Sequence, residues 1–126
     1  MIDLHIHSNH SDGTFSVIEI LKEAQRMNLD VISITDHDSI KAYKELENID
    51  VKKYYSGKII VGAEMKSVFK DIPVEILGYN IDLKKAKQRK YIDSLETLYL
   101  NIQREYLKHL KEVGKTIGLK FNEDIY

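Results

Sequence analysis

The hydrophobic and polar residues of this 126-residue chain recur with two different periods, and each period predicts one kind of element. At the amino terminus Ile2, Leu4 and Ile6 alternate with polar residues, which is the period of a strand with one face in a core. Three later stretches rich in β-branched residues predict further strands, "LDVISIT" at 29–35, "GKIIVGAE" at 57–64 and "VEILGYNI" at 74–81. We therefore expect about four strands.

Two segments between these strands have helical spacing instead. Ser16 and Glu19 form the pattern of a capping box, which is typical of the start of a helix. The apolar residues that recur at helical spacing behind it are Val17, Ile20, Leu21, Ala24 and Met27. A shorter helical segment is expected over about 39–55, weakened by an interruption at 48–50.

The last part of the chain predicts a long amphipathic helix. Between Leu83 and Val113 one apolar stripe runs through a segment rich in Lys, Arg and Glu. The stripe consists of Ile92, Leu95, Tyr99, Ile102, Tyr106, Leu110 and Val113. We expect one long helix or two joined pieces, ended by Gly114 and Gly118.

Strands that alternate with helices predict βα units and a mostly parallel sheet, so the expected fold class is α/β. A βαβ unit takes about 30 residues or more, and a closed (β/α) barrel about 200 or more. A chain of this length is therefore expected to form a sheet that does not close into a barrel. We take residues 1–126 as part of one domain, because neither an internal repeat nor a linker divides them.

Histidines and carboxylates gather where the predicted strands end, which is where parallel α/β sheets place their sites. The residues concerned are His5, His7 and Asp12 after the first strand, Asp36, His37 and Asp38 after the second, Glu64 at the end of the third and Glu75 in the fourth. Two histidines two positions apart on a strand point the same way, about 6.6 to 6.8 Å apart, so both can bind one ion. The chain has no cysteine, so we expect imidazole and carboxylate ligands for divalent manganese, zinc or iron, a set suited to phosphoester hydrolysis.

Composition narrows the classes of partner. The chain has 43% hydrophobic and 31% charged residues, as globular proteins do, and its net charge of −1 offers no overall attraction for nucleic acid or an anionic membrane. No apolar run approaches the length of a membrane span, and polar residues begin at position 3. We expect a cytoplasmic protein without a membrane partner.

The clustered motifs resemble those of a known family. The stretches "HIHSNHSDGT" at 5–14, "TDHD" at 35–38 and "GAE" at 62–64 are similar in order and spacing to the first three signature motifs of the PHP (polymerase and histidinol phosphatase) family. The stretch "ILGYNID" resembles the one that usually follows, and the similarity extends over residues 2 to about 120. The resemblance implies an incomplete PHP-type distorted (β/α)7 barrel, ending here in a long helix, with up to three metal ions in the complete site.

The resemblance also implies roles for single residues. His5, His7 and Glu64 would hold one metal, Glu64 would bridge to another, and Asp12 with His37 would help to hold a third. The helical segment 83–120 would lead to the family's inserted subdomain.

Two aspartates and one glutamate are not expected to be simple metal ligands. Asp36 and Asp38 flank His37 and are expected to orient it or to hydrogen-bond it rather than to bind metal. Glu75 stands where family members usually have histidine; it is either a metal ligand that favours manganese over zinc or a carboxylate outside the site.

The family's late motifs do not occur in these 126 residues, so the ligand set is incomplete as written. The chain is then an amino-terminal fragment, a natural short protein or a piece that assembles with another chain, and we favour the fragment. An unclosed sheet leaves an unpaired edge, which predicts self-association as a homo-oligomer.

Other polar residues have plainer interpretations. Asp3 is expected to be a structural partner or a hydrogen-bond acceptor behind the site, His10 a loop residue near it and His109 a surface residue. The basic run "KKAKQRK" at 84–90 is interpreted as a solvated helix face.

The function predicted from the sequence is metal-dependent hydrolysis of phosphoesters, with nucleotide-like phosphates or short oligonucleotides as substrates. One alternative is the PHP domain of a DNA polymerase subunit. Another is a half-domain that binds metal without turnover and serves as a structural or interaction module.

Overall fold

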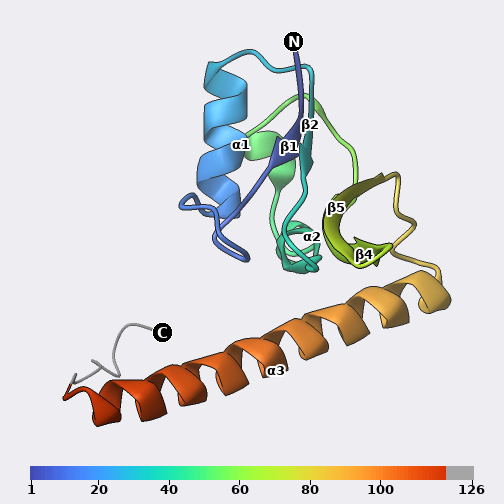
Figure 1. The fold of residues 1–126 in the computed structure, drawn as a ribbon. Coiled ribbons are helices and arrows are strands. Elements are labelled where there is room, and N and C mark those ends of the chain that lie inside the picture. The colour runs from blue at the N-terminus through green and yellow to red at the C-terminus, as the bar shows by residue number, and fades with distance from the viewer. Residues whose placement is uncertain (119–126) are drawn as a thin grey trace.

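The computed structural model describes residues 1–118, and within its last helix the side chains at 86–89, 91–93, 95–96, 99–100 and 103 lie outside the described part. The elements in chain order are β1 (Ile2–Ile6), α1 (Val17–Arg26), β2 (Val31–Ile34), α2 (Lys41–Leu46), the 3-10 helix η1 (Val51–Lys53), β3 (Lys58–Ile59), β4 (Gly62–Phe69), β5 (Ile72–Tyr79) and α3 (Ala86–Thr116). Figure 1 shows α1 alongside the first strands, the β4–β5 hairpin below them and α3 as a long rod that begins near the hairpin.

The strands β1, β2 and β3 form a parallel sheet in that order, as the alternation of strands and helices predicts. The sheet packs against α1 and α2 around one apolar core, whose buried residues are Val17, Ile20, Leu21, Ala24, Leu29, Ile32, Ile34, Ile40, Ala42, Tyr43 and Tyr55. The mixed α/β fold with a parallel sheet is therefore confirmed, and within residues 1–118 the sheet does not close into a barrel.

Helix α1 begins as expected. The side chain of Ser16 accepts from the Glu19 backbone, and the side chain of Glu19 accepts from the Ser16 backbone, which completes the capping box. Met27, the last residue of that spacing, is the C-cap of the helix and is 48% exposed, because the chain leaves the helix through Asn28, whose φ is 55°.

The predicted helical segment 39–55 contains α2 and η1, with the expected break between them. Its main anchor is the buried hydroxyl of Tyr43, which donates to the Ile34 carbonyl at 2.6 Å and lies 3.0 Å from the Ile60 carbonyl. The same oxygen accepts from the backbone N–H groups of Ile34 and Gly62. Tyr43 thus holds the parallel sheet to the segment that leads into the hairpin.

The expected third strand, 57–64, divides into β3 and the start of β4, and β4 pairs with β5 in an antiparallel hairpin. A parallel arrangement of these two strands is impossible, because only Lys70 and Asp71 connect them and a parallel pair needs a crossover of a dozen residues or more. Both connecting residues have positive φ, 48° and 64°, as a two-residue hairpin turn requires. The hairpin places Glu64 and Glu75 on neighbouring strands.

The long helix is a single element. It continues through Gly114 to Thr116, so the expectation that Gly114 helps to end it is wrong, whereas Gly118 follows its end with a φ of 75°. Three described members of its apolar stripe, Ile102, Tyr106 and Val113, are exposed. No helix among the described residues combines the length and the apolar character that crossing a bilayer requires.

Candidate metal centre

The first part of the site is the loop that follows β1. This loop folds back tightly, since a Cβ atom at Gly13 would lie 2.1 Å from the carbonyl oxygen of His7. The N–H of Gly13 donates to the Ser8 carbonyl at 3.0 Å. The turn brings Asp12 back to β1, where its Oδ1 lies 2.6 Å from Nδ1 of His7.

The second part is formed where β2 ends and β4 begins. His37 and Glu64 form an isolated parallel bridge, in which the N–H of Asp38 donates to the Glu64 carbonyl at 2.8 Å. The N–H of Glu64 in turn donates to the Asp36 carbonyl at 3.2 Å. Backbone pairing thus sets the two predicted ligands His37 and Glu64 side by side.

Three imidazole rings converge on one carboxylate oxygen. Oε2 of Glu64 lies 3.0 Å from Nε2 of His5, 2.8 Å from Nε2 of His7 and 3.7 Å from Nδ1 of His37. The ring of His7 is central, with its centroid 5.1 Å from that of His5 and 4.6 Å from that of His37. Glu64 is buried, whereas His5 stays half exposed, so the cluster is open to solvent on the His5 side.

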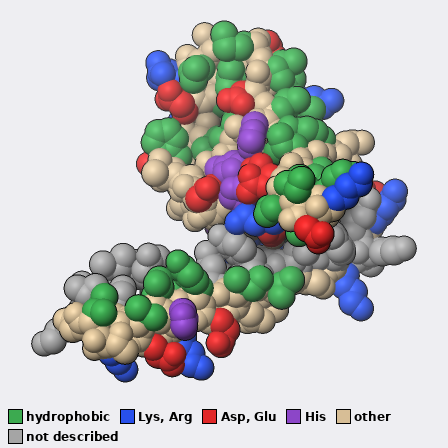
Figure 2. All heavy atoms as spheres, viewed as in Figure 1, with side chains coloured by type: hydrophobic (Ala, Val, Ile, Leu, Met, Phe, Trp, Pro, Cys, Tyr) green, Lys and Arg blue, Asp and Glu red, His purple; other side chains and the backbone are tan. Residues whose placement is uncertain are grey.

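Two further carboxylates approach His37 from opposite sides. Its Nε2 lies 3.5 Å from Oδ2 of Asp12, and its Nδ1 lies 3.9 Å from Oε1 of Glu75. The donor atoms form three groups within 4.8 Å, which are His5 with His7 and Glu64, His7 with Asp12 and His37, and His37 with Glu64 and Glu75. The structure therefore brings together all six predicted ligands, and Figure 2 shows histidine and acidic side chains gathered at one place on the surface.

The donor set fits a cation. Nε2 of His7 and Nδ1 of His37 are buried without a hydrogen-bond partner in the described part of the chain, although both lie near Oε2 of Glu64. Buried polar atoms are normally paired, and an orphaned nitrogen costs free energy. A divalent ion among these atoms would satisfy both nitrogens, and the hydrogen bond of His7 Nδ1 to Asp12 leaves Nε2 of that ring for the ion.

The charges of the site shift three pKa values. Burial lowers the pKa of His7, but the hydrogen bond to Asp12 and the negative charges of Asp12 and Glu64 outweigh burial, so this pKa is raised. Burial raises the pKa of Glu64, but the hydrogen bond to His5 and the neighbouring histidines outweigh it, so this pKa is lowered. The pKa of Asp12 is lowered, chiefly by its hydrogen bond to His7.

Asp36 has partners that the sequence did not indicate. Its buried carboxylate accepts from the Ser8 N–H at 2.7 Å, from the Ser8 hydroxyl at 2.6 Å and from the Ser11 hydroxyl at 2.7 Å. These bonds go to the loop that carries Asp12, rather than to His37. The only hint in the sequence is the pair of serines in "HSNHSDGT".

Asp38 connects the end of β2 to strand β4. Its Oδ1 accepts from the backbone N–H of Lys66 at 3.1 Å, and its own N–H is bonded to Glu64. The two aspartates that flank His37 therefore connect the end of β2 to two different segments, the loop after β1 and strand β4.

The remaining polar residues lie around this cluster. Oδ1 of Asp3 accepts from the His5 backbone at 3.2 Å. His10 lies in the loop, as expected, and its Nε2 is 2.8 Å from Oε2 of Glu45 on α2, a partner that sequence reasoning missed. His109 is exposed on α3, as expected.

Comparison with known proteins identifies the family. The model of the PHP domain matches residues 3–120 of this chain. The chain belongs to the PHP domain family.

Two relatives of this PHP domain are named as nucleases. A 5'-3' exoribonuclease of Haemophilus influenzae is 30% identical over 96 residues, which are 76% of this chain and 34% of that protein. The 5'-3' exoribonuclease Rnm of Salmonella typhimurium is 28% identical over 90 residues, 71% of this chain and 31% of that protein. The chain thus spans about a third of the length of these relatives.

Solved structures share the fold. An amidohydrolase from Chromobacterium violaceum, solved with bound sulfate and no metal, superposes with a TM-score of 0.75 at 25% identity, over 90% of this chain and 39% of that one. A candidate metal-dependent phosphoesterase from Bifidobacterium adolescentis superposes with a TM-score of 0.65 at 20% identity, over 93% of this chain and 38% of that one. This second likeness bears on the fold alone.

Proposed function

We propose that this PHP domain takes part in metal-dependent hydrolysis of phosphoesters. The observation that carries the proposal is the convergence of three histidines and three carboxylates, with two buried ring nitrogens left unpaired. The relatives that are named exoribonucleases also support it, because the links between nucleotides in RNA are phosphoesters. Nucleotide-like phosphates or short oligonucleotides are the substrates we propose.

The six ligands have distinct tasks in this proposal. His5, His7 and Glu64 would hold one ion, Asp12 and His37 would help to hold another, and Glu64 would lie between them. When bound, manganese, zinc or iron supplies Lewis acidity for the phosphoryl oxygens and lowers the pKa of a water.

Several tasks fall to the chain itself. Asp12 holds the ring of His7 by its hydrogen bond to Nδ1, which keeps Nε2 turned toward Glu64. Burial of Glu64 keeps water away from the inner side of the cluster, and the half-exposed His5 marks the side on which a phosphoester can approach.

A second candidate function is a metal-binding module without turnover. The three donor groups among the described residues share His7, His37 and Glu64, so these six side chains are too few to give each of several ions three ligands of its own. The coverage of about a third of the relatives also favours this possibility, because further ligands could come from the part of the relatives that this chain does not span.

Metal titration and a hydrolysis assay separate the candidates. Manganese would be added to the purified chain, binding measured by calorimetry, and turnover measured with a chromogenic phosphodiester. The variant His7→Ala should lose metal binding and turnover, whereas the matched variant His109→Ala, on the exposed face of α3, should keep both. Binding without turnover would favour the inactive module, and no binding at all would refute both functions.

We also propose self-association of this chain, with a second copy covering the tip of the hairpin. Val68, Phe69 and Ile72 at this tip are 67%, 62% and 61% exposed, and exposed apolar clusters of this kind favour association. Light scattering should show a dimer that the double variant Phe69→Ser and Ile72→Ser dissociates. A monomer at every concentration would refute this proposal.

A further inference from the structure

Basic residues are unevenly distributed along the chain. Residues 84–116 contain nine of the 19 basic residues but four of the 20 acidic ones, so this segment is positively charged although the whole chain has a net charge of −1. The remaining residues are correspondingly acidic and include the carboxylates of the metal centre. On the chain itself, the positive charge that would attract a polyanionic substrate therefore lies on α3, apart from any metal ions bound at the candidate site.

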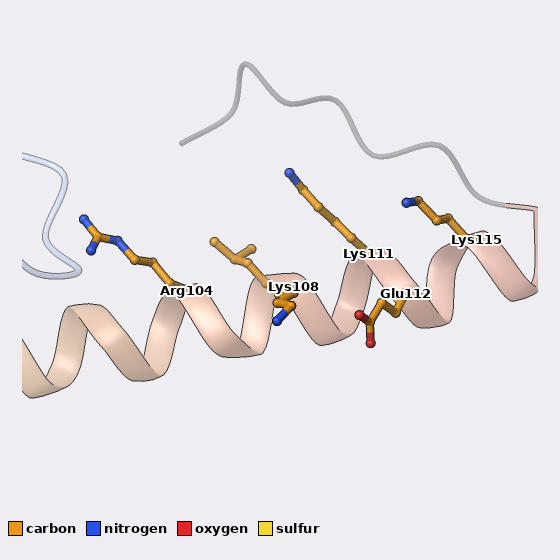
Figure 3. Close-up of a pocket in the computed structure, with 6 residues that line it drawn as sticks. Arg104, Lys108, Lys111, Glu112 and Lys115 are labelled. Carbon is orange, nitrogen blue, oxygen red and sulfur yellow. The ribbon is translucent and has the colours of Figure 1, made fainter.

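Four of these cations form one line on α3. Arg104, Lys108, Lys111 and Lys115 follow one another at intervals of four, three and four residues. At 100° per residue they lie within about 60° of one another around the helix axis. Together with Leu107 and Glu112 they line a shared hollow along the helix. Figure 3 shows Arg104, Lys111 and Lys115 extending from the same side, whereas the ends of Lys108 and Glu112 lie lower in this view.

The opposite side of the same helix is apolar. Ile102, Tyr106 and Val113 lie about 160° to 200° around the axis from Arg104. The helix is therefore apolar on one face and basic on the opposite face. The described residues that line the hollow include no aromatic side chain, so the hollow offers no ring for base stacking.

Resting on the proposed phosphoester function, we infer that Arg104, Lys108, Lys111 and Lys115 bind the phosphate backbone of a single-stranded nucleic acid, independently of base sequence. The four cations recur about once per helical turn of 5.4 Å and span about 16 Å. This repeat is close to the separation of phosphates in an extended single strand, so one cation can meet each successive phosphate. A single line of charge suits one strand better than a duplex, whose two backbones need a broader surface.

A basic face opposite an apolar face is also typical of a helix that lies in a membrane interface. The relatives that are named exoribonucleases favour a nucleic acid as the polyanion that this line binds. Binding to anionic vesicles is therefore an outcome of the test.

The test compares two variants with equal charge change. The line variant carries Arg104→Glu, Lys108→Glu, Lys111→Glu and Lys115→Glu, and the control variant carries Lys22→Glu, Lys53→Glu, Lys58→Glu and Lys70→Glu at exposed positions outside α3. Binding of a fluorescent oligouridine of about twelve nucleotides, within the usual range of single-strand sites, would be measured by anisotropy at several salt concentrations. Circular dichroism would check that α3 keeps its helicity in both variants.

The wild-type chain should show a salt slope of about −3, which is about 0.7 for each of four phosphate contacts. The line variant should bind at least tenfold more weakly with a shallower slope, and the control variant should bind within about threefold of wild type. Equal losses in both variants, unchanged binding by the line variant, or binding to anionic vesicles but not to oligouridine would overturn the inference.

The same proteins distinguish this inference from the proposed function. Binding of oligouridine is measured without metal and without turnover, so it tests the basic line alone. Both variants should keep wild-type hydrolysis of the small chromogenic phosphodiester, which is too short to reach along α3. If the chain binds oligouridine through the four cations but does not hydrolyse the phosphodiester, the proposed function is refuted. The inference about the basic line then still stands.

Discussion

Replacing Asp36 with alanine tests how the site is held together. The side chain is 1% exposed and accepts three hydrogen bonds from Ser8 and Ser11. Hydrogen bonds to a charged group contribute about 1.5–3 kcal/mol each, and a buried donor left unpaired costs about 1–3 kcal/mol. Removal of the carboxylate also removes its own desolvation cost, so we expect a net loss of about 2–4 kcal/mol in the free energy of unfolding.

The same substitution should weaken metal binding selectively. The loop that Asp36 holds carries Asp12, which belongs to the donor group with His7 and His37. Loss of a residue that supports metal ligands typically costs about 10–100-fold in affinity. We therefore expect this loss for the ion bound through Asp12 and a smaller change for the ion bound by His5, His7 and Glu64.

Two measurements check this prediction. Urea unfolding of the metal-free protein gives the stability, and calorimetric titration with manganese gives the affinity and stoichiometry of each ion. Asp50→Ala is a matched control, because Asp50 is exposed and makes no capping hydrogen bond at η1. Asp36→Asn keeps an acceptor for the Ser8 N–H and should lie between wild type and alanine. If Asp36→Ala behaves like Asp50→Ala in both measurements, the role assigned to Asp36 is refuted.

Three further predictions concern metal preference, pH and stability. Glu75→His should move the preference of the site from manganese toward zinc, measured by competition between the two ions, and an unchanged preference would place Glu75 outside the site. Because the pKa of His7 is raised above 6.5, protons should compete with metal near neutrality, so affinity measured by calorimetry should fall from about pH 8 to about pH 6. A flat profile over this range would contradict this. Tyr43→Phe should lower the free energy of unfolding by about 1–3 kcal/mol, since the N–H groups of Ile34 and Gly62 lose their acceptor; urea unfolding unchanged from wild type would contradict the role of this hydroxyl.

Local patterns made much of the fold predictable from the sequence. The capping box of Ser16 and Glu19 and the apolar spacing behind it depend on residues a few positions apart, and α1 begins where they indicate. The grouping of His5, His7 and His37 was predictable because parallel strands end at the same edge of a sheet.

Features that depend on contacts between distant parts of the chain could not be predicted from local patterns. The stretch 57–64 is one β-branched run, and its division into β3 and β4 depends on the different partners, β2 and β5, that its two halves find. The burial of Asp36 against Ser8 joins residues 28 positions apart, and no periodicity encodes that contact. The exposure of Met27 depends on where the chain turns, which its spacing does not reveal.

The short segment after β2 explains how four separate parts of the chain meet at the candidate metal centre. Each of its three consecutive residues contacts a different part of the molecule. Asp36 forms hydrogen bonds with the loop after β1, His37 faces the site, and Asp38 forms a hydrogen bond with β4. Asp38 has a φ of 47°, a left-handed conformation that aspartate tolerates better than most residues, so the backbone turns here from the parallel sheet to the hairpin. An ion-binding site needs its donors placed within a few tenths of an ångström, and side chains on separate segments reach that precision only when the segments are fastened to one another. Asp36 and Asp38 connect these segments on the two sides of His37. We therefore expect the loss of either side chain to appear first as a lower affinity for metal.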